Sequence, residues 1–122
     1  IYCVDIQEKM LSSLRKKSLK SGLSGRIITR TSTADSFNIN DLHNQIDFCL
    51  LFAVVHEIPD KKKLFYEIHH CLKKNGLLLF SEPAVHVTMN QFNTSTRIAI
   101  DAGFRIQDEP VIRWEHSVLL IK

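Results

Sequence analysis

The sequence contains only three cysteines in 122 residues, and no apolar run approaches the roughly 20 residues that a membrane-spanning helix needs. Cys3, Cys49 and Cys71 are odd in number, far apart and set among apolar residues. This pattern favours buried free thiols over a disulfide framework or a zinc site. No signal peptide opens the chain. We therefore expect a cytoplasmic protein with no metal site and no membrane partner.

An excess of one charge is also missing, because 16 Lys and Arg stand against 13 Asp and Glu for a net charge of +3. The basic residues cluster only at 15–17 and 61–63, and we interpret both runs as solvated helix faces. Nucleic acid is therefore not an expected partner. Repeats, low-complexity stretches and linkers are absent as well, which predicts a single domain over residues 1–122.

What the sequence does contain is an alternation of short apolar runs with helical periods. The pattern predicts strands at 1–6, 26–31, 46–52, 77–80, 104–111 and 115–121. Helices are expected at 7–19, from Pro59-Asp60 to a stop at Asn75-Gly76, and from 88 to 102. Thr88 and Gln91 have the spacing of a capping box at the start of the last helix.

This order predicts an α/β fold with a Rossmann-like, mostly parallel, doubly wound sheet. The last two strands are too close in sequence for a helical crossover, so they should form an antiparallel hairpin. The run at 46–52 is almost continuously apolar, which is typical of a central strand covered on both faces. Ligands of such sheets bind beyond the carboxyl ends of the strands.

Three segments carry a family resemblance: Val4-Asp5-Ile6, the run 46–60 that ends in Phe-Ala-Val-Val-His-Glu-Ile-Pro-Asp, and the run 72–79 with its Lys-Lys-Asn-Gly turn. Together they resemble the class I S-adenosylmethionine-dependent methyltransferases, most closely the ubiquinone- and menaquinone-type group. The resemblance covers almost the whole chain. It implies S-adenosylmethionine as cofactor, methyl transfer to a small-molecule acceptor, and a terminal antiparallel hairpin.

The sequence departs from that family because nothing in it matches the Gly-x-Gly-x-Gly loop after the first strand. Its four glycines, Gly22, Gly25, Gly76 and Gly103, are better interpreted as helix stops or turns. We therefore expect the first strand-helix unit to be missing and this partial domain to be truncated. The 122 residues alone should not bind the cofactor usefully, whereas a chain extended upstream by one strand-loop-helix unit should.

The resemblance assigns cofactor-binding roles at the ends of the first two predicted strands. Asp5, next to Ile6, matches the acid that accepts hydrogen bonds from the ribose hydroxyls, and a carboxylate offers several acceptor sites to a diol. The alternative is a solvated strand-end aspartate. Ala34 and Asp35 lie where the family contacts the adenine amino group, although Ser32 or Ser36 could take that position or Asp35 could cap a turn.

The resemblance also implies that Phe52, Ala53 and Val54 line the methionine half of the cofactor. His56 and Glu57 follow directly, where the acceptor should meet the methyl group, and His56 is the candidate base because imidazole titrates near neutral pH. The alternative is that His56 orients the loop while Glu57 faces water.

Glu82 and His86 follow the predicted strand at 77–80 and are candidate substrate contacts. Two other functions stay open. A nicotinamide-dependent oxidoreductase would share the fold, but Tyr66 and Tyr2 lack the lysine four positions later that short-chain dehydrogenases need. A non-catalytic methyltransferase-like module acting through protein contacts would agree with the missing glycine loop. Neither the acceptor nor the oligomeric state is specified by the sequence.

Overall fold

The computed structural model describes residues 1–33 and 36–122, so Ala34 and Asp35 lie outside the described residues. The chain separates into two compact units, Ile1–Asp41 and Leu42–Lys122. We call them the N-terminal and the C-terminal unit and describe each by itself. That the whole chain is one partial domain stays a prediction. Among the described residues, no helix combines the length and the apolar character that crossing a lipid bilayer requires.

In the N-terminal unit, the described residues form two parallel strands and one helix. Strand β1 (Tyr2–Asp5) pairs with β2 (Ile28–Thr31), with Asp5 opposite Thr31 at the carboxyl ends. Helix α1 (Glu8–Lys20) connects them, and the acid at its start suits the positive end of the helix dipole. Leu11 is the buried apolar residue of this helix.

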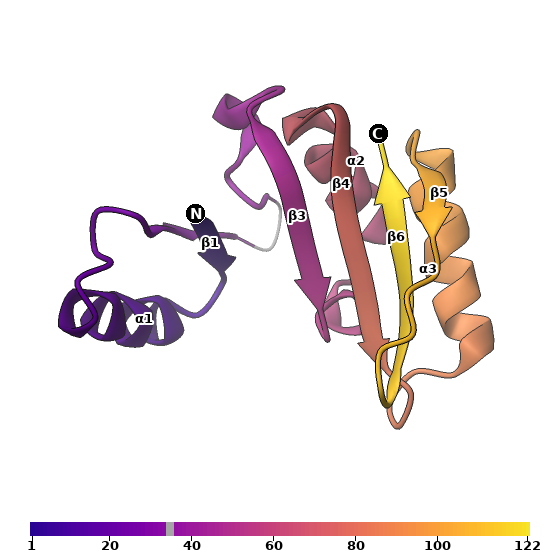
Figure 1. The fold of residues 1–122 in the computed structure, drawn as a ribbon, viewed down its shortest axis with the longest axis horizontal. Coiled ribbons are helices and arrows are strands. Elements are labelled where there is room, and N and C mark those ends of the chain that lie inside the picture. The colour runs from indigo at the N-terminus through magenta and orange to yellow at the C-terminus, as the bar shows by residue number, and fades with distance from the viewer. Residues whose placement is uncertain (34–35) are drawn as a thin grey trace. The chain divides into compact units, whose positions relative to one another are not determined.

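The C-terminal unit is a four-stranded sheet with two helices (Figure 1). In chain order its elements are β3 (Ile46–Phe52), α2 (Lys61–Cys71), β4 (Leu72–Pro83), α3 (Met89–Asp101), β5 (Arg105–Asp108) and β6 (Glu115–Ile121). The strand order is β3-β4-β6-β5, with β3 and β4 parallel and the other two pairs antiparallel. The predicted terminal hairpin of β5 and β6 is therefore confirmed.

The core of this unit lies between the sheet and its two helices, which cover one face of the sheet (Figure 1). Phe80 of β4 is fully buried and contacts Phe65 of α2 edge-on and Phe92 of α3 face-on, with ring centroids 5.7 and 4.8 Å apart. Leu78 and Leu120 fill the same layer from neighbouring strands. The side of α2 that packs in this core is formed by its buried apolar side chains, Leu64, Phe65, Ile68 and Cys71.

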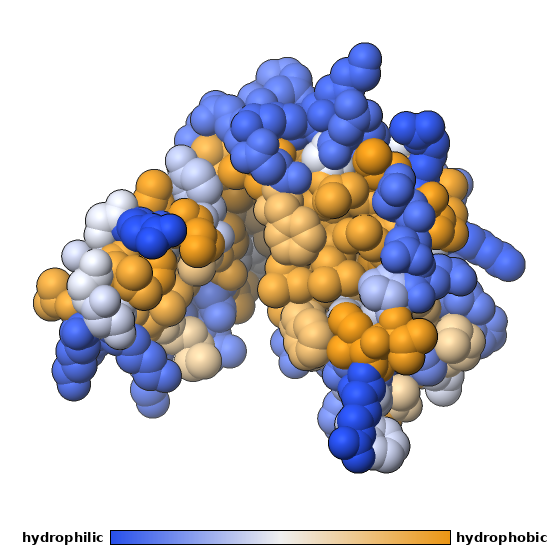
Figure 2. All heavy atoms as spheres, viewed as in Figure 1, coloured by the Kyte–Doolittle hydropathy of each residue, from blue (hydrophilic) through white to orange (hydrophobic). Residues whose placement is uncertain are grey.

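The opposite face of this sheet is apolar and exposed. Phe48, Leu50 and Phe52 alternate along β3 and are 51%, 55% and 47% exposed, and Figure 2 shows apolar surface over this part of the sheet. The prediction of a central strand covered on both faces is wrong for this sheet, because β3 is its edge strand. A run that is apolar on both faces indicates that both faces suit burial, but it does not identify what covers them.

The largest difference from the predicted boundaries lies between α2 and β4. Helix α2 ends at Cys71, not at Asn75-Gly76, and strand β4 begins at once. The register against β3 then slips from Leu72 to Leu77, so residues 73–76 form an irregularity in which Asn75 has φ of 62°. A Cβ at Gly76 would lie 2.9 Å from the Lys73 carbonyl oxygen, so the tight backbone approach requires glycine here.

The start of α3 agrees with the prediction. The Thr88 hydroxyl accepts from the Gln91 amide, and the Gln91 side chain accepts from the Thr88 amide, which completes the capping box. This local pairing fixes where the helix begins, directly after the loop that follows β4.

Candidate active site at the ends of β3 and β4

The chain makes a sharp turn where β3 ends. Ala53 adopts φ of 55°, in the left-handed region that costs a residue with a side chain about 1 kcal/mol or more. Its backbone N–H donates to the carbonyl oxygen of Ser81 at 2.9 Å, which ties the turn to β4. The following residues, Val55–Glu57, form one 3₁₀ turn. The backbone therefore reverses abruptly at the position where ligands of parallel sheets bind.

The carboxylate of Glu82 holds this turn from inside. Its side chain is 2% exposed, and it accepts backbone N–H groups from Val54 at 3.0 Å, Val55 at 2.7 Å and His56 at 3.2 Å. Successive backbone N–H groups that converge in this way form an anion-binding nest. The nest compensates the burial of the negative charge, so the turn and Glu82 stabilise each other.

Glu82 also contacts the ring of His56, whose Nδ1 lies 2.5 Å from Oε2. A carboxylate can only accept, so Nδ1 carries the proton of this hydrogen bond. In the neutral ring the other nitrogen, Nε2, is then unprotonated, and within the described residues it makes no hydrogen bond. The side chain remains 30% exposed. The arrangement is that of an oriented base, in which a buried carboxylate fixes the tautomer of a histidine.

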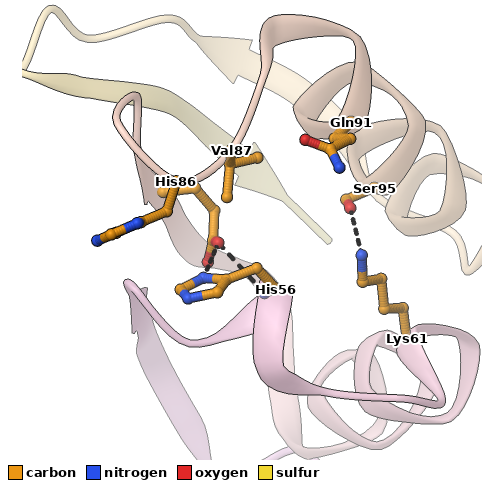
Figure 3. A pocket seen from close by; sticks show the side chains of 7 residues that line it. His56, Lys61, His86, Val87, Gln91 and Ser95 are labelled. Carbon is orange, nitrogen blue, oxygen red and sulfur yellow. Dashed lines mark hydrogen bonds and ion pairs between the residues drawn. The ribbon is translucent and has the colours of Figure 1, made fainter.

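A hollow of about 240 Å³ opens beside this pair. It is lined by His56, Lys61, Glu82, His86, Val87, Gln91 and Ser95 (Figure 3). The ring of His86 lies nearly parallel to that of His56, with centroids 6.4 Å apart. On the helical side, the Nζ atom of Lys61 donates to the hydroxyl of Ser95 at 3.3 Å. The hollow thus has a histidine side and a lysine side.

Three of the four predicted catalytic and substrate-contacting residues meet at this hollow. His56, Glu82 and His86 line it, whereas Glu57 is exposed and is not among the lining residues. Glu82 does not follow a strand, as predicted, but lies inside β4, which extends to Pro83. Since its two carboxylate oxygens are hydrogen-bonded to the protein, it orients His56, and a direct contact of Glu82 with a substrate stays untested.

The residues predicted to line the cofactor's methionine half lie at the carboxyl end of β3. Phe52 is 47% and Val54 36% exposed, and Ala53 forms the turn between them. In the N-terminal unit, Asp5 ends β1 half-buried, and its Oδ1 accepts from the Gln7 amide at 2.7 Å. Ile6 is 60% exposed.

The sequence interpretation did not identify Lys61 and Ser95 as residues of the hollow. It also gave Gln91 only its place in the capping box, whereas the structure shows that Gln91 lines the hollow as well. Lys61 was assigned to a solvated face with Lys62 and Lys63, but it is half-buried and reaches into the hollow. One signal was available, because a lysine at the first position of a helix opposes the helix dipole. No comparable signal marks Ser95, a small polar residue within the helical pattern.

The cysteine thiols take no part in the hollow. All three are free, and burial raises the pKa of Cys49 to about 12, so this thiol stays protonated at neutral pH. Among the described residues, no group of three or more His, Cys, Asp or Glu side chains is arranged to hold a metal ion.

A model of the family described as a methyltransferase domain matches residues 1–80. This range includes β1, the turn after β3 and His56, and it stops two residues before Glu82. Among curated proteins, no match to this sequence is found.

Solved structures share the fold. A SAM-dependent methyltransferase from Aquifex aeolicus is 21% identical with a TM-score of 0.81, over 98% of this chain and 67% of that protein. An S-adenosylmethionine-dependent methyltransferase from Mesorhizobium loti is 16% identical with a TM-score of 0.77, over 99% and 79%. The fibrillarin pre-rRNA processing protein of Methanococcus jannaschii is 17% identical with a TM-score of 0.72, over 98% and 54%. This chain therefore spans about half to four fifths of their lengths, and the predicted Rossmann-like α/β class is confirmed.

Proposed function

We propose, from the premise that this chain belongs to the methyltransferase-domain family, that it takes part in S-adenosylmethionine-dependent methyl transfer to a small-molecule acceptor. The family match confirms the resemblance to the S-adenosylmethionine-dependent methyltransferases, without distinguishing the ubiquinone- and menaquinone-type group, and favours methyl transfer over a nicotinamide-dependent oxidation. The observation that carries the proposal is the His56–Glu82 pair, joined at 2.5 Å beside the hollow at the ends of β3 and β4.

The described residues fit the chemistry of this cofactor. Asp5 commits Oδ1 to the Gln7 amide, and its other oxygen retains acceptor capacity for a ribose hydroxyl. Phe52 and Val54 present exposed apolar surface at the end of β3, which suits the uncharged parts of the molecule. When bound, S-adenosylmethionine supplies a methyl group on a positively charged sulfur.

His56 would take the proton that an acceptor O–H or N–H loses on methylation. Glu82 keeps Nδ1 as the protonated nitrogen, so Nε2 has the lone pair that accepts. His56→Asn should therefore lower turnover while leaving the affinity for the cofactor within a few-fold. A variant that turns over as fast as the parent across neutral pH would remove the base role from His56.

Binding of S-adenosylhomocysteine to the full-length protein, measured by calorimetry, tests the cofactor assignment. Asp5→Ala should weaken binding by about 1.5 to 3 kcal/mol, the scale of a hydrogen bond to a charged group. The matched control is Asp47→Ala, because Asp47 is exposed and pairs with the Lys73 ammonium at 2.6 Å. A folded protein without measurable affinity would favour the alternative of a non-catalytic module.

A further inference from the structure

Lys61 stands where a positive charge is unfavourable for the helix that it opens. The first turn of α2 contains no acid, and Lys62 and Lys63 repeat the charge at its positive end. The cap residue, Asp60, accepts the backbone N–H of Lys63 through its side chain. Helix stability therefore does not explain a lysine at position 61, and such departures from local rules concentrate at functional sites.

The Lys61 ammonium is not paired with a carboxylate in the part of the chain that the structure describes. The side chain is half-buried and donates to the Ser95 hydroxyl, and among the described residues no acid lies within ion-pair distance of it. Glu82 lines the same hollow, but its oxygens accept from His56 and from three backbone N–H groups. Within the described residues the hydrogen-bond partner of Lys61 is a neutral hydroxyl, so this half-buried ammonium suits a ligand that brings a negative charge.

Gln91 adds a second donor on the same side of the hollow. Its Oε1 accepts from the backbone N–H and the hydroxyl of Thr88, both at 2.9 Å. The capping box therefore fixes which end of the amide is the oxygen, and the amide nitrogen is left on the side of Ser95 and Lys61 (Figure 3). An ammonium and an amide nitrogen, both donors only, match the two acceptor oxygens of a carboxylate.

We propose that the hollow binds the methyl acceptor as a small carboxylate, held by Lys61 and Gln91, with its proton-bearing heteroatom toward His56. Naming this ligand the acceptor rests on the proposed function, whereas carboxylate binding at Lys61 does not. The volume of about 240 Å³ lies just below the usual 300 Å³ lower bound for pockets of drug-sized ligands. This size suits a small organic acid.

Matched pairs of a carboxylate and its uncharged amide test the proposal in the full-length protein without cofactor. The probes are benzoate against benzamide and 3-hydroxypropionate against 3-hydroxypropionamide, titrated while backbone amide signals are followed by NMR. We expect both carboxylates to bind more tightly than their amides and to shift the signals of Lys61, Gln91 and Ser95. Lys61→Met should weaken carboxylate binding about tenfold, the scale of one hydrogen bond to a charged group.

Lys62→Met is the control, because Lys62 carries the same charge one position further on but is exposed and does not line the hollow. It should leave affinity within twofold, and Lys61→Arg should retain most of the binding. Carboxylates that bind no better than amides, or equal losses in the two methionine variants, would overturn the proposal. So would inorganic phosphate that binds more tightly than either acid. Carboxylate binding in a protein that fails to bind S-adenosylhomocysteine would support this inference while refuting methyl transfer.

Discussion

Replacing Glu82 by glutamine should destabilise the C-terminal unit more than any change of one exposed acid. The carboxylate accepts four hydrogen bonds, three from backbone N–H groups of residues 54–56 and one from His56. A glutamine keeps one carbonyl oxygen, which can still accept from Val54 and Val55. The amide nitrogen of the glutamine would instead face the backbone N–H and the Nδ1–H group of His56, which are both donors. We expect a loss of about 1.5 to 3 kcal/mol, because bonds to a charged, buried acceptor are lost and a donor is left unpaired.

Urea denaturation followed by far-UV circular dichroism measures this loss. Glu109→Gln is the control, because Glu109 is an exposed acid, and it should stay within 0.5 kcal/mol of the parent. His56→Gln should cost less than Glu82→Gln, since it removes one of the four bonds at a side chain that is 30% exposed. A Glu82→Gln variant as stable as its control would refute the anchoring role, and an equal loss in Glu82→Gln and His56→Gln would locate the stability in the hydrogen bond between the two side chains alone.

Other expectations follow from single positions. Thr88→Ala should cost about 1 kcal/mol in urea denaturation and Thr88→Ser much less, because only alanine removes the cap. Gly103→Ala should cost about 2 kcal/mol or more, since φ is 111° and a Cβ would lie 2.8 Å from a ring nitrogen of His69, whereas Gly25→Ala should be near neutral. Burial lowers the pKa of His69 below 6.5. The contribution of the neutral, buried His69 ring to the free energy of unfolding is therefore fully present above pH 6.5 and is lost as pH drops through the folded pKa. His69→Gln should flatten that pH dependence. Cys49, with its pKa raised to about 12 by burial, should be alkylated at pH 8 about a thousandfold more slowly in the folded than in the denatured chain, measured by mass spectrometry.

Features that depend on neighbouring residues could be predicted from the sequence. The capping box needs only Thr88 and Gln91, and the terminal hairpin follows from a connection too short for a crossover. The strand at 46–52 has the predicted bounds, and its start directly follows the polar residues His43, Asn44 and Gln45. These signals are local, so they do not depend on how the chain packs.

The pairing of His56 with Glu82 could not be predicted, because it depends on the register of two strands. Phe52 lies opposite Ser81 only because residues 73–76 leave the regular pairing between β3 and β4. The prediction of a helix end at Asn75-Gly76 placed that irregularity inside the helix and shortened the following strand. Glu82 consequently became a loop residue in the sequence interpretation and a substrate contact instead of a partner for His56.

Three departures from ordinary stability rules lie around the turn and the hollow at the ends of β3 and β4. Ala53 takes a left-handed backbone conformation, Glu82 buries a charge, and Lys61 places a charge against its helix dipole. The hydrogen bonds between the Glu82 carboxylate and the backbone N–H groups of residues 54–56 compensate the first two, because they hold the turn and satisfy the buried charge. Glu82 does not compensate Lys61, which it does not contact within ion-pair distance. A site selected for stability alone would replace that lysine, so the remaining cost is best explained by a ligand that carries the opposite charge.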